Sequence, residues 1–147
     1  NVLHDLMLGA AALGISISYA VPEGFEPNEE VVKRASALAK TSGSKVEMTH
    51  DPIEAVKDAN VVYTDVFISM GEEHLKEKIN AFDGFQVNEE LISNADPDYI
   101  FMHCLPARRG MEITEAVIDG PQSAVFDEAE NRLHAQKAVL SWCLSGN

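Results

Sequence analysis

Short β-forming runs alternate with helical segments along the whole 147-residue chain, and this alternation constrains the fold more than any other feature. Strands are expected over residues 15–21, 45–49, 61–64, 99–103 and 123–126. Helical segments separate them, so each strand should return to the sheet through a right-handed crossover beside a parallel neighbour. The sequence therefore predicts an α/β fold, a Rossmann-like parallel sheet with helices on both faces.

Capping residues indicate where the helices begin and end. Helices are expected over residues 3–13, 28–39 and 72–82, and after Asp51, Asn88 and Asp127. Asn and Asp side chains accept hydrogen bonds from the first turn of a helix, which is why they favour its start. Gly14 should end the first helix, because glycine adopts the left-handed conformation that closes a helix.

The start of the chain is unusual for this type of fold. The first element is a helix, and its beginning at Asn1 looks like the far end of a strand–helix turn. A doubly wound domain normally opens with the strand of that turn. We therefore expect residues 1–147 to be the second half of a longer polypeptide, with the first strand of the sheet missing.

Composition and charge exclude several classes of function. The chain carries 24 acidic and 11 basic residues, a net charge of −13, which argues against nucleic acid or an anionic membrane as partners. No apolar run reaches the length of about 18 residues expected of a membrane span. Cys104 and Cys143 do not form a CxxC pair, so we expect no disulfide framework and a cytoplasmic location.

Cofactor motifs are also missing from the sequence. The five histidines show no HxxH or HExxH spacing and no Cys/His pattern of a zinc site. GxGxxG, P-loop and GxSxG motifs do not occur either, which disfavours a nicotinamide cofactor despite the Rossmann-like alternation. We therefore expect a site that works without a metal or an organic cofactor.

Chemically useful side chains follow the predicted strands. Cys104 ends the apolar run 99–103 just before Leu105 and Pro106, and Asp65 follows the run 61–64. In parallel α/β sheets, ligands bind at the carboxyl ends of the strands. We therefore expect residues 1–4, 65–71, 104–109 and 127–132 to converge at one edge, as a site for a small zwitterion.

Each of these residues also has a structural interpretation. Cys104 could be a small buried hydrophobe, and Asp65 could cap a turn. Arg132 stands early in the last helix, where the helix dipole disfavours a cation, although Glu128 and Glu130 could neutralise it. Structural roles are favoured for four other residues: His103 should face a helix, Cys143 should belong to the core, and Arg108 and Arg109 should be solvated loop charges.

Three motifs together resemble the ornithine carbamoyltransferase family. They are His103-Cys104-Leu105-Pro106, Ile68-Ser69-Met70-Gly71 with Asp65 four residues before Ser69, and Glu128-Ala129-Glu130-Asn131-Arg132. Residues 1–4 are similar to the tail of that family's Gly-Asn-Asn turn. The resemblance runs along essentially the whole chain, but it covers only the second of the family's two α/β domains, the one that binds ornithine. The Ser-Thr-Arg-Thr segment that binds carbamoyl phosphate does not occur here.

The resemblance implies that ornithine's neutral δ-amine attacks carbamoyl phosphate, giving citrulline and phosphate. It places Asn1 and the Met70 backbone at the α-carboxylate of ornithine, and Asp65 and Ser69 at the α-ammonium group. Cys104 would lie beside the δ-amine and assist its deprotonation with Asp65.

The family pattern also assigns groups to the carbamoyl oxygen. Arg132 and the backbone around Cys104 and Leu105 would meet this oxygen, where negative charge develops in the transition state.

The same resemblance implies a partner domain and a quaternary structure. The carbamoyl phosphate-binding domain would complete the site, so the isolated chain is expected to be inactive. The full-length enzyme is expected to be a homotrimer, while the oligomeric state of this chain stays open. Two alternatives remain: a carbamoyltransferase for another amine, such as putrescine or N-acetylornithine, and a non-catalytic fragment that binds a small ligand.

Overall fold

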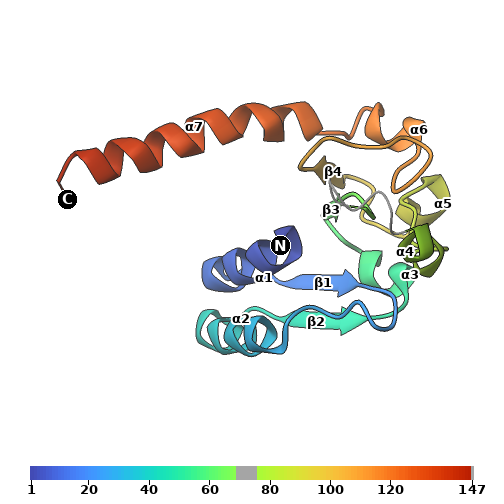
Figure 1. The fold of residues 1–147 in the computed structure, drawn as a ribbon, viewed down its shortest axis with the longest axis horizontal. Coiled ribbons are helices and arrows are strands. Elements are labelled where there is room, and N and C mark those ends of the chain that lie inside the picture. Colours follow the sequence, from blue (N-terminus) through green and yellow to red (C-terminus); the bar gives the residue numbers. More distant parts are fainter. Residues whose placement is uncertain (69–75, 147) are drawn as a thin grey trace.

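Strands and helices alternate along the chain (Figure 1). The computed structural model describes residues 1–68 and 76–146. Its elements are α1 (Val2–Leu13), β1 (Ile17–Ala20), α2 (Glu29–Ser42), β2 (Val46–Thr49), α3 (Pro52–Val56), β3 (Val61–Thr64), α4 (Lys76–Ala81), α5 (Glu89–Ile92), β4 (Ile100–His103), α6 (Glu115–Ile118) and α7 (Val125–Leu144). The predicted α/β fold is confirmed.

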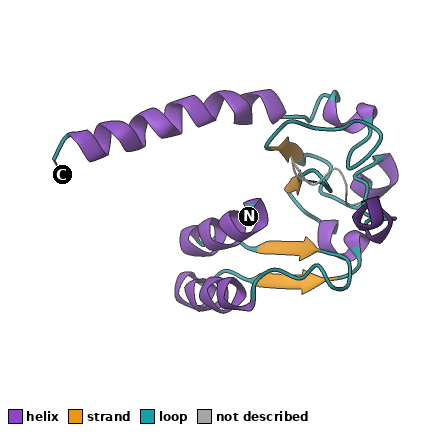
Figure 2. Cartoon of the chain, in the orientation of Figure 1, coloured by secondary structure: helices purple, strands orange, loops and turns teal. Residues whose placement is uncertain are grey.

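The four strands form two parallel pairs (Figure 2). β1 pairs with β2, beginning with Ile17 opposite Val46. β3 pairs with β4, and the last residues of this pair, Thr64 and His103, lie opposite each other. The parallel direction agrees with the prediction, but the described strands make two separate two-stranded sheets and not one continuous ladder.

Local capping explains where several helices begin and end. The side chains of Asn28, Asp51 and Asn88 each accept a hydrogen bond from a backbone N–H in the first turn of α2, α3 and α5, at 2.8 to 2.9 Å. Gly14 ends α1 with a φ of 76°, and the N–H of Ile15 reaches back to the Ala10 carbonyl. The predicted caps at these four positions are confirmed.

Two hydrophobic clusters form the core. One joins α1, α2 and β1 through buried residues that include Met7, Ala11 and Ala35. The small alanine side chains allow the two helices to approach each other closely. The other cluster surrounds β3 and β4, with Phe101 fully buried at its centre and Val125 joining it from the start of α7. This second cluster supports the strand ends that carry Asp65 and Cys104.

The predicted strand over residues 123–126 is wrong. Only Ser123 makes a β-bridge, to Phe101, and the chain enters α7 at Val125. Phe101 makes two backbone hydrogen bonds with this segment: its N–H donates to the Gln122 carbonyl, and its carbonyl accepts from the Ala124 N–H. Helix α7 therefore begins two residues before Asp127, which is not its cap.

Two other helices differ from the predictions. α4 covers the second part of the helix predicted over residues 72–82, and residues 72–75 lie outside the described part of the chain. The single-turn helix α6 was not predicted. It buries Val117 and Ile118, which belong to the cluster that Leu105 and Ala107 of the loop after β4 pack against.

Helix α7 projects away from the rest of the molecule (Figure 1). Its only buried residue is Val125, and Trp142 and Leu144 are 63% and 85% exposed. Cys143 is exposed as well, so its predicted place in the core is wrong for this chain. Within residues 1–68 and 76–146, no helix is both long enough and apolar enough to cross a bilayer.

Candidate active site

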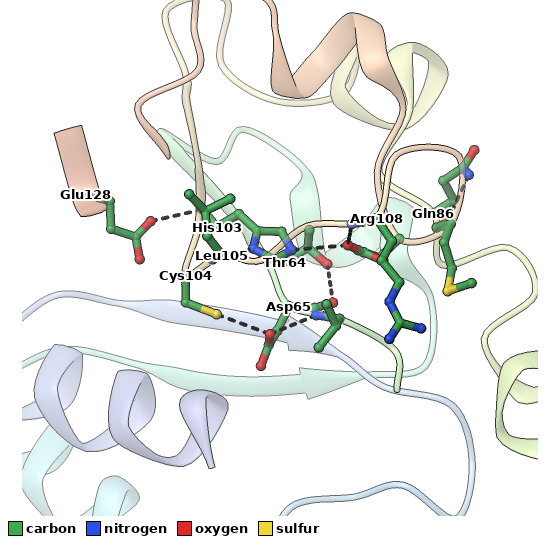
Figure 3. Close-up of polar contacts among 11 residues, drawn as sticks. Thr64, Asp65, Gln86, His103, Cys104, Leu105, Arg108 and Glu128 are labelled. Atoms are coloured by element: carbon green, nitrogen blue, oxygen red, sulfur yellow. Dashed lines mark hydrogen bonds and ion pairs between the residues drawn. The ribbon is translucent and has the colours of Figure 1, made fainter. Parts of the chain in front are cut away.

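A thiol and a carboxylate meet where β3 and β4 end. Because Thr64 lies opposite His103, the residues that follow, Asp65 and Cys104, leave the sheet side by side. The Cys104 thiol donates a hydrogen bond to Oδ1 of Asp65 at 3.1 Å (Figure 3). The backbone N–H of Val66 donates to the same oxygen at 2.8 Å, which holds the carboxylate toward the thiol. The structure thus brings together the two side chains that the sequence placed at one edge.

The surroundings of Cys104 keep its thiol protonated. Burial, followed by the hydrogen bond and the charge of Asp65, raises the pKa of Cys104 from its ordinary value of 9.0 to about 11. At neutral pH the group is therefore a thiol that donates to Asp65, and its sulfur lone pairs can still accept a hydrogen bond. Such a group suits the orientation of an amine better than covalent attack, which requires a thiolate.

Aromatic packing holds the segment that follows Asp65. The ring of Phe67 stacks on that of Phe82, with centroids 4.7 Å apart and an interplanar angle of 21°. Phe82 also makes edge contacts with Phe25 and Phe85. Aromatic pairs of this kind contribute about 0.5–1.5 kcal/mol beyond the area that they bury. The cluster links the chain beyond β3 to the loops after β1 and α4.

Glu128 connects helix α7 to both strands. Its Oε1 accepts a hydrogen bond from the Tyr63 hydroxyl at 2.8 Å. Its Oε2 accepts from the His103 backbone N–H at 2.9 Å, which Figure 3 shows. The sequence suggested Glu128 as part of a family motif and as a neighbour that could neutralise Arg132, and Tyr63 was not considered. The signal for Tyr63 was its polar hydroxyl near the end of an apolar strand.

A fully buried pair, His103 and Glu112, supports the loop after β4. Nδ1 of His103 accepts from the Leu105 N–H at 2.9 Å, so a neutral ring carries its proton on Nε2. That nitrogen lies 3.3 Å from Oε1 of Glu112, without the directionality of a hydrogen bond, and we describe it as an electrostatic contact. Both side chains have no solvent exposure. The contacts of the His103 ring are thus with the loop after β4, and not with a helix as predicted.

Glu112 also fixes the backbone of this loop. It accepts a hydrogen bond from the Arg108 N–H. Burial raises the pKa of Glu112, but the contacts with His103 and the Arg108 N–H outweigh burial and hold that pKa below its ordinary value. Sequence reasoning missed Glu112, whose one signal is an acid between the apolar residues Met111 and Ile113.

Leu105 lies where the chain turns sharply away from the strand. Its φ is 53°, and its peptide bond to Pro106 is cis. The Leu105 N–H is already used by His103, whereas its carbonyl accepts no hydrogen bond among the described residues. The backbone at Leu105 therefore offers an acceptor to a ligand and not a donor.

Arg132 lies exposed on α7, one turn beyond Glu128. Since α7 begins at Val125, Arg132 stands later in the helix than the sequence suggested. Its side chain makes no hydrogen bond or ion pair with any part of the chain that the structure describes. Arg109, by contrast, donates twice to the Asp119 carboxylate, both times at 2.7 Å, and is not simply a solvated loop charge.

The remaining predicted site residues are placed only in part. Asn1 is exposed at the start of α1, and no contact joins its side chain to Cys104 or Asp65 among the described residues. Ser69 and Met70 lie outside the described residues. Within the described ranges, no group of three His, Cys, Asp or Glu side chains is arranged to hold a metal ion.

Comparisons with known proteins cover nearly the whole chain. A family model described as "Aspartate/ornithine carbamoyltransferase, Asp/Orn binding domain" matches residues 1–143. The catabolic ornithine carbamoyltransferase of Thermoplasma acidophilum is 58% identical over 146 residues, which are 99% of this chain and 48% of that protein. The anabolic ornithine carbamoyltransferase of Pyrococcus furiosus is 54% identical over 147 residues, 99% of this chain and 47% of that protein.

A solved structure gives the same result. The ornithine carbamoyltransferase from Pyrococcus furiosus superimposes with a TM-score of 0.92 at 56% identity, over 96% of this chain and 45% of that one. The chain thus spans about half the length of the curated relatives that it matches.

Proposed function

Because the chain belongs to the Asp/Orn-binding domain family of the aspartate/ornithine carbamoyltransferases, we propose that it is the ornithine-binding half of an ornithine carbamoyltransferase. The contact between the Cys104 thiol and the Asp65 carboxylate carries this proposal, because it forms a polar site at the edge where α/β sheets bind ligands. A carbamoyl phosphate-binding half would complete the site, since the relatives are about twice as long as this chain.

The first task of the site is to bind ornithine and to make its δ-amine nucleophilic. In the proposed arrangement, Asp65 and Ser69 bind the α-ammonium group, while Asn1 and the Met70 backbone bind the α-carboxylate. The Cys104 sulfur accepts a hydrogen bond from the δ-amine while its own proton points to Asp65. An amine must lose its proton before it can attack, and the thiol–carboxylate pair offers a route for that proton.

The transfer step forms one bond and breaks another. The δ-nitrogen bonds to the carbamoyl carbon, and the bond from that carbon to the phosphate oxygen breaks, releasing phosphate. The extra proton on nitrogen passes to the sulfur as the thiol proton moves to Asp65, so the thiol is regenerated. Asp65 releases each proton that it takes up to water, which restores its carboxylate. No covalent bond to Cys104 is needed.

Arg132 and the Leu105 carbonyl would bind the carbamoyl group from opposite sides. The guanidinium of Arg132 donates to the carbamoyl oxygen as negative charge develops there, and removing one such donor typically costs about 10²–10³ in rate. The Leu105 carbonyl, which has no partner among the described residues, accepts from the carbamoyl NH₂ group. This revises the predicted role of Leu105, whose N–H donates to His103.

The choice of acceptor and the assembly belong to the same proposal. An amine without an α-ammonium group, such as putrescine, brings no positive charge to Asp65, and the acetylated α-nitrogen of N-acetylornithine is uncharged. We therefore propose ornithine as the acceptor. We also propose a homotrimer for the full-length enzyme and a cytoplasmic location, in keeping with two free cysteines.

Citrulline formation by the full-length protein tests the proposal. The protein is given carbamoyl phosphate with ornithine, putrescine or N-acetylornithine, and ornithine binding is followed by titration calorimetry with and without carbamoyl phosphate. We expect turnover with ornithine, lost in Asp65→Ala and strongly reduced in Cys104→Ala. Cys143→Ala is the matched control, because that thiol is exposed on α7. Turnover with another amine, or no ornithine binding under either condition, would refute the assignment.

A further inference from the structure

Tyr63, His103 and Glu128 form a three-residue contact that we call the Glu128 clamp. It joins elements far apart in the sequence, because Tyr63 lies in β3, His103 ends β4 and Glu128 lies in the first turn of α7. Both carboxylate oxygens are used, one by the Tyr63 hydroxyl and the other by the His103 N–H. The ornithine site described above assigns no role to Tyr63 or to Glu128.

The clamp differs from an ordinary surface carboxylate. Glu130, two residues along the same helix, is exposed and lies 3.5 Å from His134 on the next turn. Glu128 is half-buried and turned to the protein, which is costly for a charge unless its oxygens find donors. Hydrogen bonds to an ionised carboxylate are about twice as strong as neutral ones. Glu128 is therefore held in one orientation while its neighbours on α7 remain in solvent.

This orientation determines how α7 is turned about its axis. Residues four apart lie on the same face of a helix, about 6 Å apart along its axis. Arg132 follows Glu128 by four residues and so lies on the face that Glu128 directs toward the strand ends. Beyond Glu128, every residue of α7 that the structure describes is exposed. Within this chain, Val125 and Glu128 are therefore the residues of α7 that hold its rotation against the strands.

The clamp also reaches the backbone and the side chain of Cys104. The His103 N–H that it binds belongs to the residue immediately before Cys104. Burial, followed by the Glu128 hydrogen bond and the charge of Cys104, raises the pKa of Tyr63. One carboxylate thus touches the surroundings of Cys104 and the helix of Arg132 at the same time.

We propose that Glu128 and Tyr63 are positioning residues for carbamoyl transfer, which fix Arg132 relative to Cys104. The inference rests on the proposed function for its catalytic part. Neither residue touches the substrate. Each acts through Arg132 and Cys104, which do touch the substrate in the proposed arrangement. A misplacement of about 1 Å in a reacting group can cost about 10²-fold in rate.

Kinetics of two conservative variants in the full-length protein test this role. Glu128→Gln keeps the size of the side chain but has only one acceptor oxygen for two donors. Tyr63→Phe removes one donor and leaves the ring. The matched controls are Glu130→Gln, on the exposed side of the same helix, and Tyr99→Phe, a buried tyrosine at the opposite end of β4.

A split between kcat and KM is expected. The kcat should fall about tenfold in Glu128→Gln and about threefold in Tyr63→Phe, while the KM for ornithine stays within about twofold, because the groups that bind its α-carbon substituents are unchanged. Both controls should behave like the unaltered protein. Clamp variants that match their controls, or that raise KM at constant kcat, would overturn the inference.

Hydrogen exchange gives a readout that does not depend on turnover. In Glu128→Gln, peptides covering the end of β4 and the first turns of α7 should exchange faster than in Glu130→Gln, because the His103 amide loses its charged acceptor. Unchanged exchange there would overturn the clamp itself. If the unaltered protein makes no citrulline, the proposed function and the catalytic part of the inference are both refuted. Hydrogen exchange would still test whether Glu128 holds the end of β4 and the start of α7 together.

Discussion

Replacing Asp65 with asparagine should make the Cys104 thiol react faster with alkylating agents. Burial, then the hydrogen bond and the charge of Asp65, hold the pKa of Cys104 at about 11. The amide of the Asp65→Asn variant would keep an oxygen that accepts from the thiol but would lose the charge that opposes a thiolate. Coulomb's law at the dielectric constant of water gives about 1.3 kcal/mol for two unit charges 3.1 Å apart, the observed distance between Sγ and Oδ1.

This energy corresponds to about a tenfold increase in the thiolate fraction at neutral pH, because about 1.36 kcal/mol equals one pKa unit. A lower dielectric constant at the site would make the increase larger, so tenfold is the smallest effect consistent with the contact. Alkylation proceeds through the thiolate, and its rate below the pKa should rise by the same factor.

The assay is the rate of iodoacetamide labelling at pH 8, followed by mass spectrometry. Cys143→Ser serves as the background, so that Cys104 is the one thiol left in the chain. Asp98→Asn is the matched control, because this exposed carboxylate lies at the amino end of β4, away from Cys104. A labelling rate in Asp65→Asn equal to that of the control would show that the carboxylate does not influence the thiol. The electrostatic reasoning about the site would then be wrong.

Two further substitutions test the support beneath the site. Glu112→Gln should lower the free energy of unfolding at neutral pH by about 1–3 kcal/mol, because the buried contact between His103 and Glu112 loses the carboxylate charge. Folding lowers the pKa of Glu112 below its ordinary value of 4.5. The ionised carboxylate therefore stabilises the folded state above pH 4.5, and this stabilisation is lost as the pH falls through the pKa of the folded state. Urea titrations from pH 3 to 7 should therefore show a shallower acid decline in the variant than in the unaltered chain; equal slopes would contradict this. Phe101→Ala should cost about 3–5 kcal/mol in the same assay, and a loss below about 1 kcal/mol would show that the cluster around β3 and β4 repacks.

Local sequence features determined the order of elements and most of their ends. Asn28, Asp51 and Asn88 cap their helices within three residues, and Gly14 ends α1 through its own backbone conformation. Such signals can be read from the sequence because cause and effect lie within one helical turn.

The sequence also predicted that Asp65 and Cys104 would approach each other. That prediction needed only parallel strands that end at the same edge, and the paired ends Thr64 and His103 supply this arrangement. The motifs around Cys104 likewise indicated the family that the comparisons show.

Tertiary structure decided the contacts between residues that are distant in sequence. Glu128 binds Tyr63 across 65 positions, and Phe101 takes the backbone bonds of residues 122 and 124, which turns a predicted strand into the start of α7. Neither outcome has a local signal, because a buried carboxylate or carbonyl is stabilised by whichever donor packing brings near it. The sequence thus determined which groups stand at the strand ends, and the packing of α7 against β4 decided which of them hold one another in place.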